Sequence, residues 1–229
     1  MTDGPLLGVV IVAAGSGVRF GDPGKALAPL AGVPLLSHSL ALFAALPNAR
    51  EIVIVVAEHM LERCGDLLAE HRIARARVVR GGATPADSVR SGLSALDPAI
   101  THVVVHDAAR PLVTAALAQR LIDAALASGA AVPVVPVSDT LHTVSPDGTL
   151  AATLDRSNLR AAQTPQVARR DWLEHACRVA AGTTDEGGLL TAAGYPVTLV
   201  DGDPGNLKIT WPEDLALAEA ILALRTVVK

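Results

Sequence analysis

Residues 7–17 read LGVVIVAAGSG. The run Leu7–Ala13 is apolar throughout, which is typical of a strand that other elements cover on both faces of a parallel sheet. Two glycines around a serine follow at 15–17, where this strand ends. Ligands of open α/β sheets bind beyond the carboxyl ends of the strands, and glycines leave backbone N–H groups accessible to an anion. We therefore expect a ligand site at this turn; the alternative is an ordinary strand-to-helix turn.

Short apolar runs alternate with longer amphipathic runs along the rest of the chain. The expected strands are Leu7–Ala13, Glu51–Val56, Arg77–Arg80, His102–His106, Ala130–Pro136 and Val197–Val200. The expected helices are Leu35–Leu46, Met60–His71, Ala86–Leu96, Ala115–Ala127 and Asp171–Ala181. This alternation predicts an α/β fold with a doubly wound, mostly parallel sheet, which we take as one domain over residues 1–229.

Two helix starts carry expected capping residues. Thr84 is predicted to cap one helix, with Pro85 at its first position. A last helix is predicted to start at the sequence TWPED, with Thr210 as its N-cap and Glu213 completing a capping box.

The composition argues against some classes of function. Half of the 229 residues are apolar, only 2% are aromatic, and the net charge is −4. Nucleic-acid binders present a basic face and often stack bases on aromatic rings, so we expect no nucleic-acid partner. An anionic small molecule needs only a local group of cations and is compatible with this charge.

The amino-terminal region and the cysteines indicate the compartment. No charged segment precedes an apolar stretch at the start, and the run Leu6–Ala14 is too short to span a bilayer. We expect a cytoplasmic, soluble protein with no membrane partner. Cys64 and Cys177 lie far apart without metal-like spacing, so buried free thiols are expected rather than a disulfide.

One segment interrupts the alternation, at residues 138–157, SDTLHTVSPDGTLAATLDRS. SPDG is a turn signature between two β-prone runs, so the segment predicts a hairpin that is too polar for the central sheet. A two-stranded hairpin by itself is marginally stable in water. We therefore expect a β-arm at about 137–160 that packs on a second subunit.

The glycine turn differs from two familiar phosphate-binding loops. The dinucleotide pattern has a third glycine where this chain has Phe20, and the P-loop continues with Ser or Thr where this chain has Ala26. Arg19 and Lys25 follow the turn instead. A forked arginine and a mobile lysine can together hold a polyphosphate.

A second set of candidate residues lies in the sequence VVVHDAARP at 103–111. Asp107 follows an apolar run at the carboxyl end of an expected central strand, and Mg²⁺ is usually held by one or two carboxylates together with substrate phosphates. The alternative for Asp107 is a helix cap or a turn residue. We expect His106 to form structural hydrogen bonds and Arg110 to be a further cation at this site.

Further charged residues occur in LDRSNLRAAQTPQ, TTDEG and GNLKIT. They are Arg156, Arg160, Asp185, Glu186 and Lys208. Taken singly, each predicts solvated surface, although the apolar residues around Lys208 favour an inward position for it.

In this order, the motifs resemble those of the 2-C-methyl-D-erythritol 4-phosphate cytidylyltransferases over essentially the whole chain. The shared motifs are AAGSGVR with a following lysine, GG…ADSV, VHDAARP, DT, DR, QTPQ, TDE and NLKIT. The first motif alone marks only the wider nucleotidyltransferase superfamily. The resemblance implies a Rossmann-like nucleotidyltransferase fold with a protruding β-arm for dimerisation. It also implies Mg²⁺-dependent transfer of CMP from CTP to methylerythritol phosphate, with release of pyrophosphate, in the non-mevalonate isoprenoid pathway.

The resemblance also assigns roles to residues. Arg19 and Lys25 would stabilise the triphosphate during attack on its α-phosphorus, and Asp107 would be the metal ligand. The cytosine and ribose would be held at Ala13, Ala14, Gly15, Gly82, Ala83 and Ser88. The methylerythritol phosphate would be held at Arg110, Thr140, Arg156, Thr164 and Lys208, with Arg156 and Lys208 also counted as catalytic. The arm that carries Arg156 would cross to the partner in a homodimer.

This chemistry needs no general base, because a phosphate monoester is already ionised at neutral pH. Catalysis would rest on positioning and on charge stabilisation. The chain departs from the family pattern at four positions. Gly24 replaces a usual Pro, Ala83 a frequent polar residue, Pro85 a common Arg and Gly187 a usual Ala.

Three alternatives remain at this point. A ribitol 5-phosphate cytidylyltransferase tends to have Val where this chain has Ala109. A molybdopterin nucleotidyltransferase shares the first motif but lacks QTPQ and NLKIT. A non-catalytic nucleotide-binding regulator is the third, and the joint presence of Arg19, Lys25, Asp107 and Lys208 argues against it.

Overall fold

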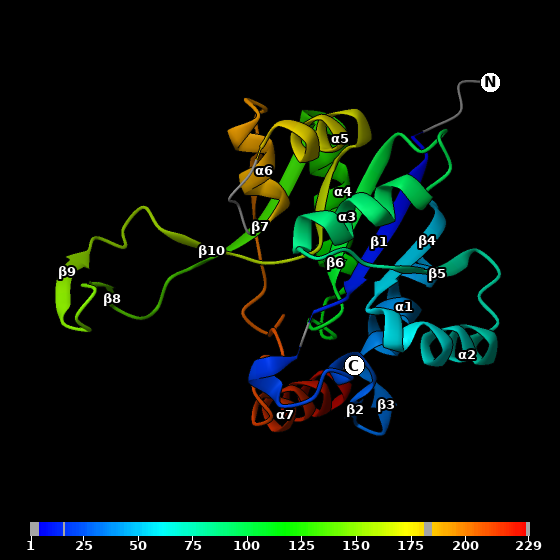
Figure 1. Ribbon diagram of the computed structural model, residues 1–229, viewed down its shortest axis with the longest axis horizontal. Helices are drawn as coiled ribbons and strands as arrows, with labels where there is room; N and C mark the ends of the chain where they lie inside the picture. The colour runs from blue at the N-terminus through cyan, green and yellow to red at the C-terminus, as the bar shows by residue number, and fades with distance from the viewer. Residues whose placement is uncertain (1–4, 16, 181–184, 228–229) are drawn as a thin grey trace.

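The computed structural model describes residues 5–15, 17–180 and 185–227. Within these ranges the central sheet has eight strands in the order β10-β7-β11-β6-β1-β4-β5, with β12 paired to β7 (Figure 1). The strands are β1 (Leu7–Ala13), β4 (Ala49–Val56), β5 (Ala76–Arg80), β6 (His102–Asp107), β7 (Ala130–Pro136), β10 (Arg160–Ala162), β11 (Gln166–Arg169) and β12 (Thr198–Asp201). Pairing among β6, β1, β4 and β5 is parallel, and only β10 and β11 run antiparallel to their neighbours. The predicted mostly parallel α/β fold is confirmed.

The first strand lies in the middle of this sheet. Val9, Val10 and Ile11 are fully buried because neighbouring strands flank β1 and helices cover both of its faces. The parallel register sets Ala13 beside Val56 and Val12 beside Asp107. The glycine turn and Asp107 therefore leave the sheet at the same edge.

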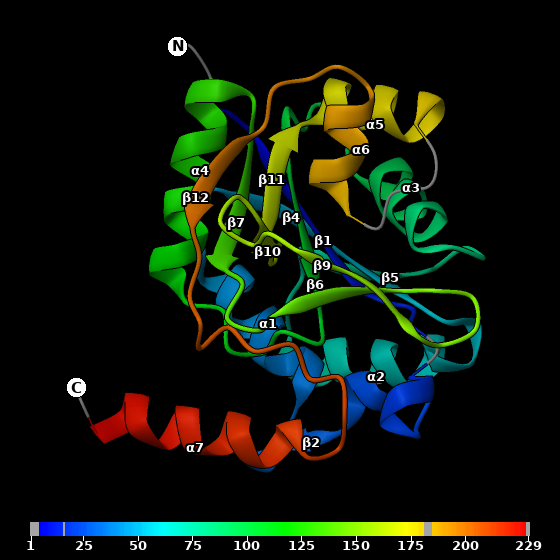
Figure 2. The same cartoon turned by 90° about the vertical axis from the view of Figure 1, so that its left-hand side faces the viewer.

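Helices cover the two faces of the sheet. They are α1 (Leu35–Ala45), α2 (Leu61–His71), α3 (Pro85–Ala95), α4 (Ala115–Ser128), α5 (Arg170–Val179), α6 (Glu186–Ala192) and α7 (Asp214–Val227). One buried cluster joins α1, α2 and α4 to the sheet, and a second joins α3, α5 and α6 to its other face. Figure 2 shows α4 and α3 on opposite sides of the sheet, and α7 running apart from it beside β2 (Pro29–Leu30).

Most predicted elements coincide with observed ones to within two residues. The helix predicted at Asp171–Ala181 is observed as α5, and Ala181 lies outside the described residues. The sequence patterns missed β10, β11 and α6, which are all short. None of the helices in the described ranges is long and apolar enough to cross a membrane. Cys64 and Cys177 are buried and free, as predicted.

The two predicted caps have different outcomes. Thr84 caps α3 in a capping box with Asp87, and Pro85 takes the first helical position, as predicted. The prediction for Thr210 and Glu213 is wrong. The Asp214 carboxylate instead accepts the backbone N–H groups of Thr210 and Trp211 at 2.6 and 2.8 Å, and α7 begins at Asp214. One oxygen of the Asp214 carboxylate, Oδ2, accepts both bonds, so the backbone N–H of Thr210 is not available to the Glu213 side chain for a capping box.

The predicted hairpin is present as β8 (Leu141–Val144) and β9 (Leu150–Leu154). In the part of the chain that the structure describes, these strands pair only with each other, from Leu141 opposite Leu154 to Val144 opposite Leu150. The turn between them closes through the Gly148 N–H, which donates to the Ser145 carbonyl at 2.9 Å. Figure 1 shows this arm extending away from the central sheet.

Candidate active site

A cavity of about 820 Å³ opens beyond the carboxyl ends of β1 and β6. Its walls come from the turn after β1, the start of α3, the end of β6, the segment between β10 and β11, the start of α6, and Lys208. Nine of the predicted site residues line it: Ala14, Gly15, Gly82, Ala83, Ser88, Asp107, Arg110, Thr164 and Lys208. The fold thus brings residues from distant parts of the sequence to one edge of the sheet.

The interruption between β10 and β11 explains how Thr164 reaches this edge. Ala162 pairs with Val134 and Val167 pairs with Ala131, so the two short strands follow one antiparallel path along β7. Residues 163–165 leave that path just beyond the end of β6. The Asp107 N–H donates to the Thr164 hydroxyl oxygen at 3.0 Å, which holds Thr164 beside the end of β6.

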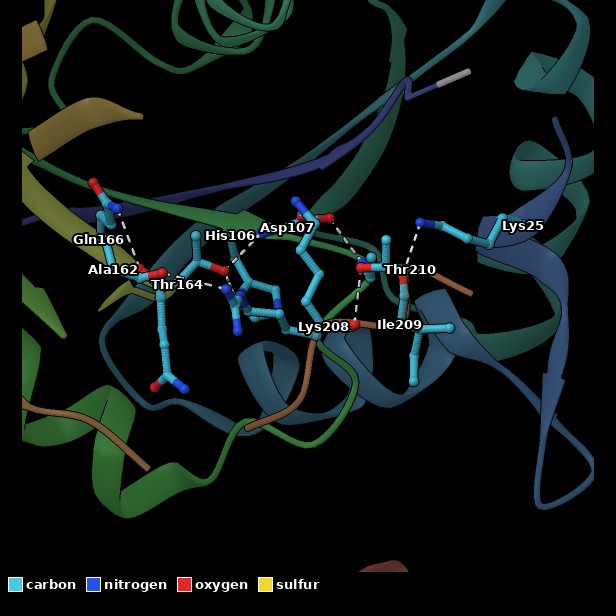
Figure 3. Close-up of polar contacts among 12 residues, drawn as sticks. Lys25, His106, Asp107, Ala162, Thr164, Gln166, Lys208, Ile209 and Thr210 are labelled. Carbon is cyan, nitrogen blue, oxygen red and sulfur yellow. Dashed lines mark hydrogen bonds and ion pairs between the residues drawn. The ribbon is translucent and has the colours of Figure 1, made fainter. Parts of the chain in front are cut away.

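Asp107 forms an ion pair in the cavity. One carboxylate oxygen lies 2.7 Å from Lys208 Nζ, and the other accepts the Ala109 N–H at 2.9 Å (Figure 3). Burial acts to raise the pKa of Asp107, but Lys208 and the Ala109 N–H outweigh it and hold this pKa below its ordinary value. Asp107 is therefore an anionic turn residue as well as a cavity residue.

Arg110 has its guanidinium fixed by two carbonyl groups. It donates to the Asn206 carbonyl at 2.8 Å and to the Ala162 carbonyl at 3.3 Å. Burial lowers the pKa of this guanidinium while Asp107 raises it, with a net lowering. Asn206 in turn donates from its side-chain amide to the Thr164 carbonyl at 2.8 Å. These bonds join the segment before Lys208 to the segment that carries Thr164.

Lys25 and Arg19 lie next to the cavity without lining it. Lys25, in the 3₁₀ turn η2 (Lys25–Leu27), donates to the Ile209 carbonyl at 2.9 Å (Figure 3). Burial lowers the pKa of the Lys25 ammonium; Lys208 and Arg19 lower it further, and Asp107 opposes them. Lys208 and Arg19 therefore lie close enough to Lys25 to repel its charge, which favours binding of an anion between these three cations.

The turn before these cations depends on one glycine. Gly17 has φ +62°, and a Cβ at this position would clash with the Asp22 carbonyl oxygen. Arg19 follows in η1 (Val18–Phe20) with its side chain exposed. Glycine at position 17 thus allows the close turn that brings Arg19 and Lys25 to the same side of the sheet.

The opposite wall of the cavity is formed by the turn before α3. The Ser88 hydroxyl donates to the Thr84 carbonyl at 3.1 Å and accepts the Gly82 N–H at 3.2 Å. A Cβ on Gly82 would clash with Asp87, so this turn also excludes larger residues. The result is a narrow wall of backbone and small side chains.

Comparison with known proteins gives the family. The family model for 2-C-methyl-D-erythritol 4-phosphate cytidylyltransferase matches residues 7–224. The chain belongs to this family. A relative of that name from Dehalococcoides mccartyi (strain CBDB1) is 40% identical over 218 residues, covering 94% of this chain and 96% of the relative. Another from Chromobacterium violaceum is 44% identical over 228 residues, covering 94% and 97%.

Solved structures of the family share the fold. The crystal structure of a 2-C-methyl-D-erythritol 4-phosphate cytidylyltransferase from Thermus thermophilus is 34% identical, with a TM-score of 0.77 over 93% of this chain and 98% of that one. The 4-diphosphocytidyl-2C-methyl-D-erythritol synthase from Anaerococcus prevotii is 27% identical, with a TM-score of 0.83 over 96% and 100%. The ribitol phosphate, molybdopterin and regulator alternatives are not favoured.

Three residues that the family resemblance placed at the site lie elsewhere in this chain's structure. Ala13 packs against the core beneath the cavity instead of lining it. Thr140 and Arg156 are exposed on the arm, where the Arg156 guanidinium donates to the Ser138 carbonyl.

Sequence reasoning missed the wall formed by α6. Gln166 donates to Asp185 at 3.0 Å and accepts the Gly187 N–H at 2.8 Å, which joins β11 to the start of α6. Glu186 was expected at the surface but is only 9% exposed and lines the cavity. Burial raises the pKa of Glu186 to about 7, with Asp185 and Asp107 adding to the increase. The sequence TDEG gave the only signal, and nothing in it predicts burial.

The carboxylate ligands available in the cavity fit a magnesium ion that binds together with a polyphosphate. Within the described ranges, no group of three or more His, Cys, Asp or Glu residues is placed to hold a metal ion. Asp107 offers a single ionised carboxylate, and Mg²⁺ is commonly bound by one or two carboxylates with substrate phosphates and waters. Asp185 caps α6 through the Gly188 N–H at 3.0 Å and is engaged by Gln166.

Proposed function

We propose that the 820 Å³ cavity holds both substrates of the family's reaction, with the residues around Asp107 at its centre. Membership of the family gives that reaction. The chain transfers CMP from CTP to 2-C-methyl-D-erythritol 4-phosphate, which yields 4-diphosphocytidyl-2-C-methyl-D-erythritol and pyrophosphate in the non-mevalonate isoprenoid pathway. The observation that carries the proposal is the convergence of Asp107, Arg110, Thr164 and Lys208 beside the small-residue wall of Gly82 and Ser88.

The nucleotide is assigned to the small-residue wall. Ala14 and Gly15 on one side and Gly82, Ala83 and Ser88 on the other leave backbone groups open to a flat base and a ribose. Close backbone approach suits a pyrimidine and leaves little space for a purine. Because Ala83 has no polar side chain, base recognition depends more on backbone groups than in relatives with a polar residue there.

The acceptor phosphate is assigned to Arg110, Thr164 and Lys208. These three groups offer two cations and a hydroxyl from three different segments of the cavity wall. Thr140 and Arg156 would add to this subsite from the arm of a partner. Exposed apolar side chains on the isolated arm support such a partner, because Val144 is 68% exposed and Leu150 is 62% exposed.

Catalysis is assigned to positioning and charge. The ionised phosphate of the acceptor attacks the α-phosphorus of CTP, a P–O bond forms there, and the bond to the departing pyrophosphate breaks with its electrons. Arg19 and Lys25 bind the triphosphate as negative charge moves to the leaving group. Asp107 would hold Mg²⁺, which supplies further charge neutralisation when bound. No residue needs to remove a proton from the nucleophile.

Pyrophosphate release with a panel of substrates tests this proposal. CTP with methylerythritol phosphate, erythritol 4-phosphate or ribitol 5-phosphate compares the acceptors, and ATP, GTP and UTP with methylerythritol phosphate compare the nucleotides. We expect the pair of CTP and methylerythritol phosphate to exceed every other pair by about tenfold or more in kcat/KM. Equal turnover of ribitol 5-phosphate or of ATP contradicts the proposal.

A further inference from the structure

A chain of hydrogen bonds beneath the cavity links α1 to Thr164. Ser39 on α1 and His106 on β6 are both 0% exposed. The Ser39 hydroxyl oxygen lies 3.1 Å from His106 Nε2. His106 Nδ1 lies 3.2 Å from the Thr164 hydroxyl oxygen (Figure 3). The edge of Phe43 packs against the imidazole with 5.0 Å between ring centres. His106 therefore forms the predicted structural hydrogen bonds, and one of them ends at a cavity residue.

The direction of these bonds follows from counting donors. Among the described residues, His106 Nε2 is the only hydrogen-bond partner of the Ser39 hydroxyl. A buried O–H without an acceptor is unfavourable, so the Ser39 hydroxyl donates and Nε2 accepts. Nε2 then carries no proton, and the neutral ring carries its proton on Nδ1.

The same count determines the direction of the hydrogen bonds of the Thr164 hydroxyl. Its oxygen accepts the Nδ1 proton of His106 and the N–H of Asp107, and these two bonds use both of its lone pairs. The hydroxyl hydrogen is left without an acceptor among the described residues. Thr164 is half-buried and lines the cavity, so this hydrogen can be donated to an acceptor in the cavity.

We propose that Ser39 and His106 are positioning residues that fix the Thr164 hydroxyl as a hydrogen-bond donor to a phosphate oxygen of the acceptor substrate. In the opposite orientation, Thr164 would donate to His106 and present only its remaining lone pair to the cavity, which would repel an anion. This inference rests on the proposed function, because it takes the phosphate of methylerythritol phosphate as the occupant of the subsite. It assigns an orientation to the Thr164 hydroxyl hydrogen and adds two positioning residues, Ser39 and His106, to the proposed site.

The tautomer of His106 tests the inference without any substrate. In a two-bond ¹H–¹⁵N correlation spectrum of the labelled wild-type chain, we expect His106 to have a protonated Nδ1 and an unprotonated Nε2. The spectrum of His106→Gln identifies the resonances among the 7 histidines. A protonated Nε2 overturns the inference and leaves the proposed function untouched, whereas a wild-type chain that releases no pyrophosphate contradicts the proposed function and leaves the tautomer result intact.

A double-mutant cycle tests whether Ser39 acts through Thr164. A hydrogen bond to a charged group corresponds to a factor of about 10 to 100 in affinity, so Thr164→Val should lower kcat/KM for methylerythritol phosphate by about that factor. Ser39→Ala should lower it by about three- to tenfold, mainly through KM for the acceptor and not for CTP. In the Thr164→Val background, Ser39→Ala should have no further effect on kcat/KM.

Ser37 provides a matched control on the same helix. It is buried, and its hydroxyl lies 3.0 Å from Nε2 of another histidine, His71, which has no contact with the cavity. Ser37→Ala should reduce stability to a similar extent as Ser39→Ala while KM for the acceptor stays unchanged. Additive losses in the double mutant, or equal effects of Ser37→Ala and Ser39→Ala on KM, overturn the inference.

Discussion

Lysine is rare in this chain, and the candidate site holds two of the three lysines. Lys25, Lys208 and Lys229 are the three, against sixteen arginines. Lysine is a compact, mobile charge, whereas arginine is a planar fork that suits fixed geometry. In the structure Lys208 binds Asp107 and Lys25 binds the Ile209 carbonyl. We expect both ammonium groups to exchange these contacts for substrate oxygens by rotation of their side chains.

Substitution of the triphosphate cations tests their proposed role. We expect Lys25→Ala and Arg19→Ala each to lower kcat by a factor on the order of 10²–10³, because each removes a donor that meets charge developing on the leaving group. Initial rates of pyrophosphate release at saturating substrates measure this. Arg50→Ala is the control, since Arg50 is exposed at the amino end of β4, on the opposite edge of the sheet. A rate within about threefold of wild type contradicts the role.

The raised pKa of Glu186 predicts how stability depends on pH. Burial raises this pKa to about 7 from an ordinary value of 4.5, so the native state holds the proton to a higher pH than the unfolded chain does. The free energy of unfolding should therefore fall as pH rises from about 4.5 to about 7, by up to about 3 kcal/mol.

Glu186→Gln removes this penalty while keeping the shape of the side chain. Urea unfolding of the substrate-free chain should show the variant more stable than wild type at pH 8, and close to wild type at pH 5. The exposed Glu62 on α2 supplies the control Glu62→Gln, which should show no such difference between the two pH values. An equal stability difference for Glu186→Gln at both pH values contradicts the assignment.

Sequence reasoning located some site residues and not others, for physical reasons. Asp107 was predictable because an apolar run ends at it and the carboxyl ends of parallel strands form ligand sites. Its partner Lys208 gave only a weak signal, because nothing local specifies which carboxylate a lysine meets. Glu186 was misread because its burial comes from the packing of α6 against distant elements, which adjacent residues do not encode.

At the scale of elements, the long and regular ones were predictable. The pattern of Leu7–Ala13 gives β1 without error, since burial on both faces requires an unbroken apolar run. β10 and β11 have three and four residues and are interrupted at residues 163–165, so no periodicity identifies them. Their positions come from pairing with β7 and β6, which is a property of the assembled sheet.

Two substitutions at the start of α7 distinguish the capping residue expected from the sequence from the one observed in the structure. Asp214→Ala removes the acceptor of two backbone N–H groups and should lower the free energy of unfolding by about 1–2 kcal/mol. Glu213→Ala should change it by less than about 0.5 kcal/mol, because Glu213 is exposed and precedes the helix. Urea unfolding measures both. A larger loss for Glu213→Ala than for Asp214→Ala would favour the capping box expected from the sequence.

At the scale of the whole molecule, the arm is the feature that a single chain leaves unexplained. Among the described residues, its strands pair only with each other, and it extends from the sheet edge (Figure 1). The hairpin itself was predictable from SPDG, whereas its partner is not encoded in any local pattern. We propose a homodimer in which each arm supplies Arg156 to the cavity of the other chain.

Mixing two inactive variants tests the crossed arm. Arg156→Ala and Lys25→Ala chains should each be nearly inactive alone, and the mixture should regain activity. Half of the dimers are mixed after statistical exchange, and half of their sites are intact, so recovery should reach about a quarter of wild type. Absence of recovery, with subunit exchange demonstrated by differently tagged chains, shows that Arg156 serves its own chain or no site.

A ³¹P NMR time course of the wild-type chain with CTP, methylerythritol phosphate and Mg²⁺ measures directly whether the chain transfers CMP to this acceptor. We expect CTP and the acceptor to disappear together, and pyrophosphate and a cytidine diphosphate-linked product to appear in equal amounts. When the acceptor is left out, the CTP signals should stay unchanged and no pyrophosphate should appear. Formation of free CMP, or pyrophosphate release that does not depend on methylerythritol phosphate, would show that the chain does not transfer CMP to this acceptor.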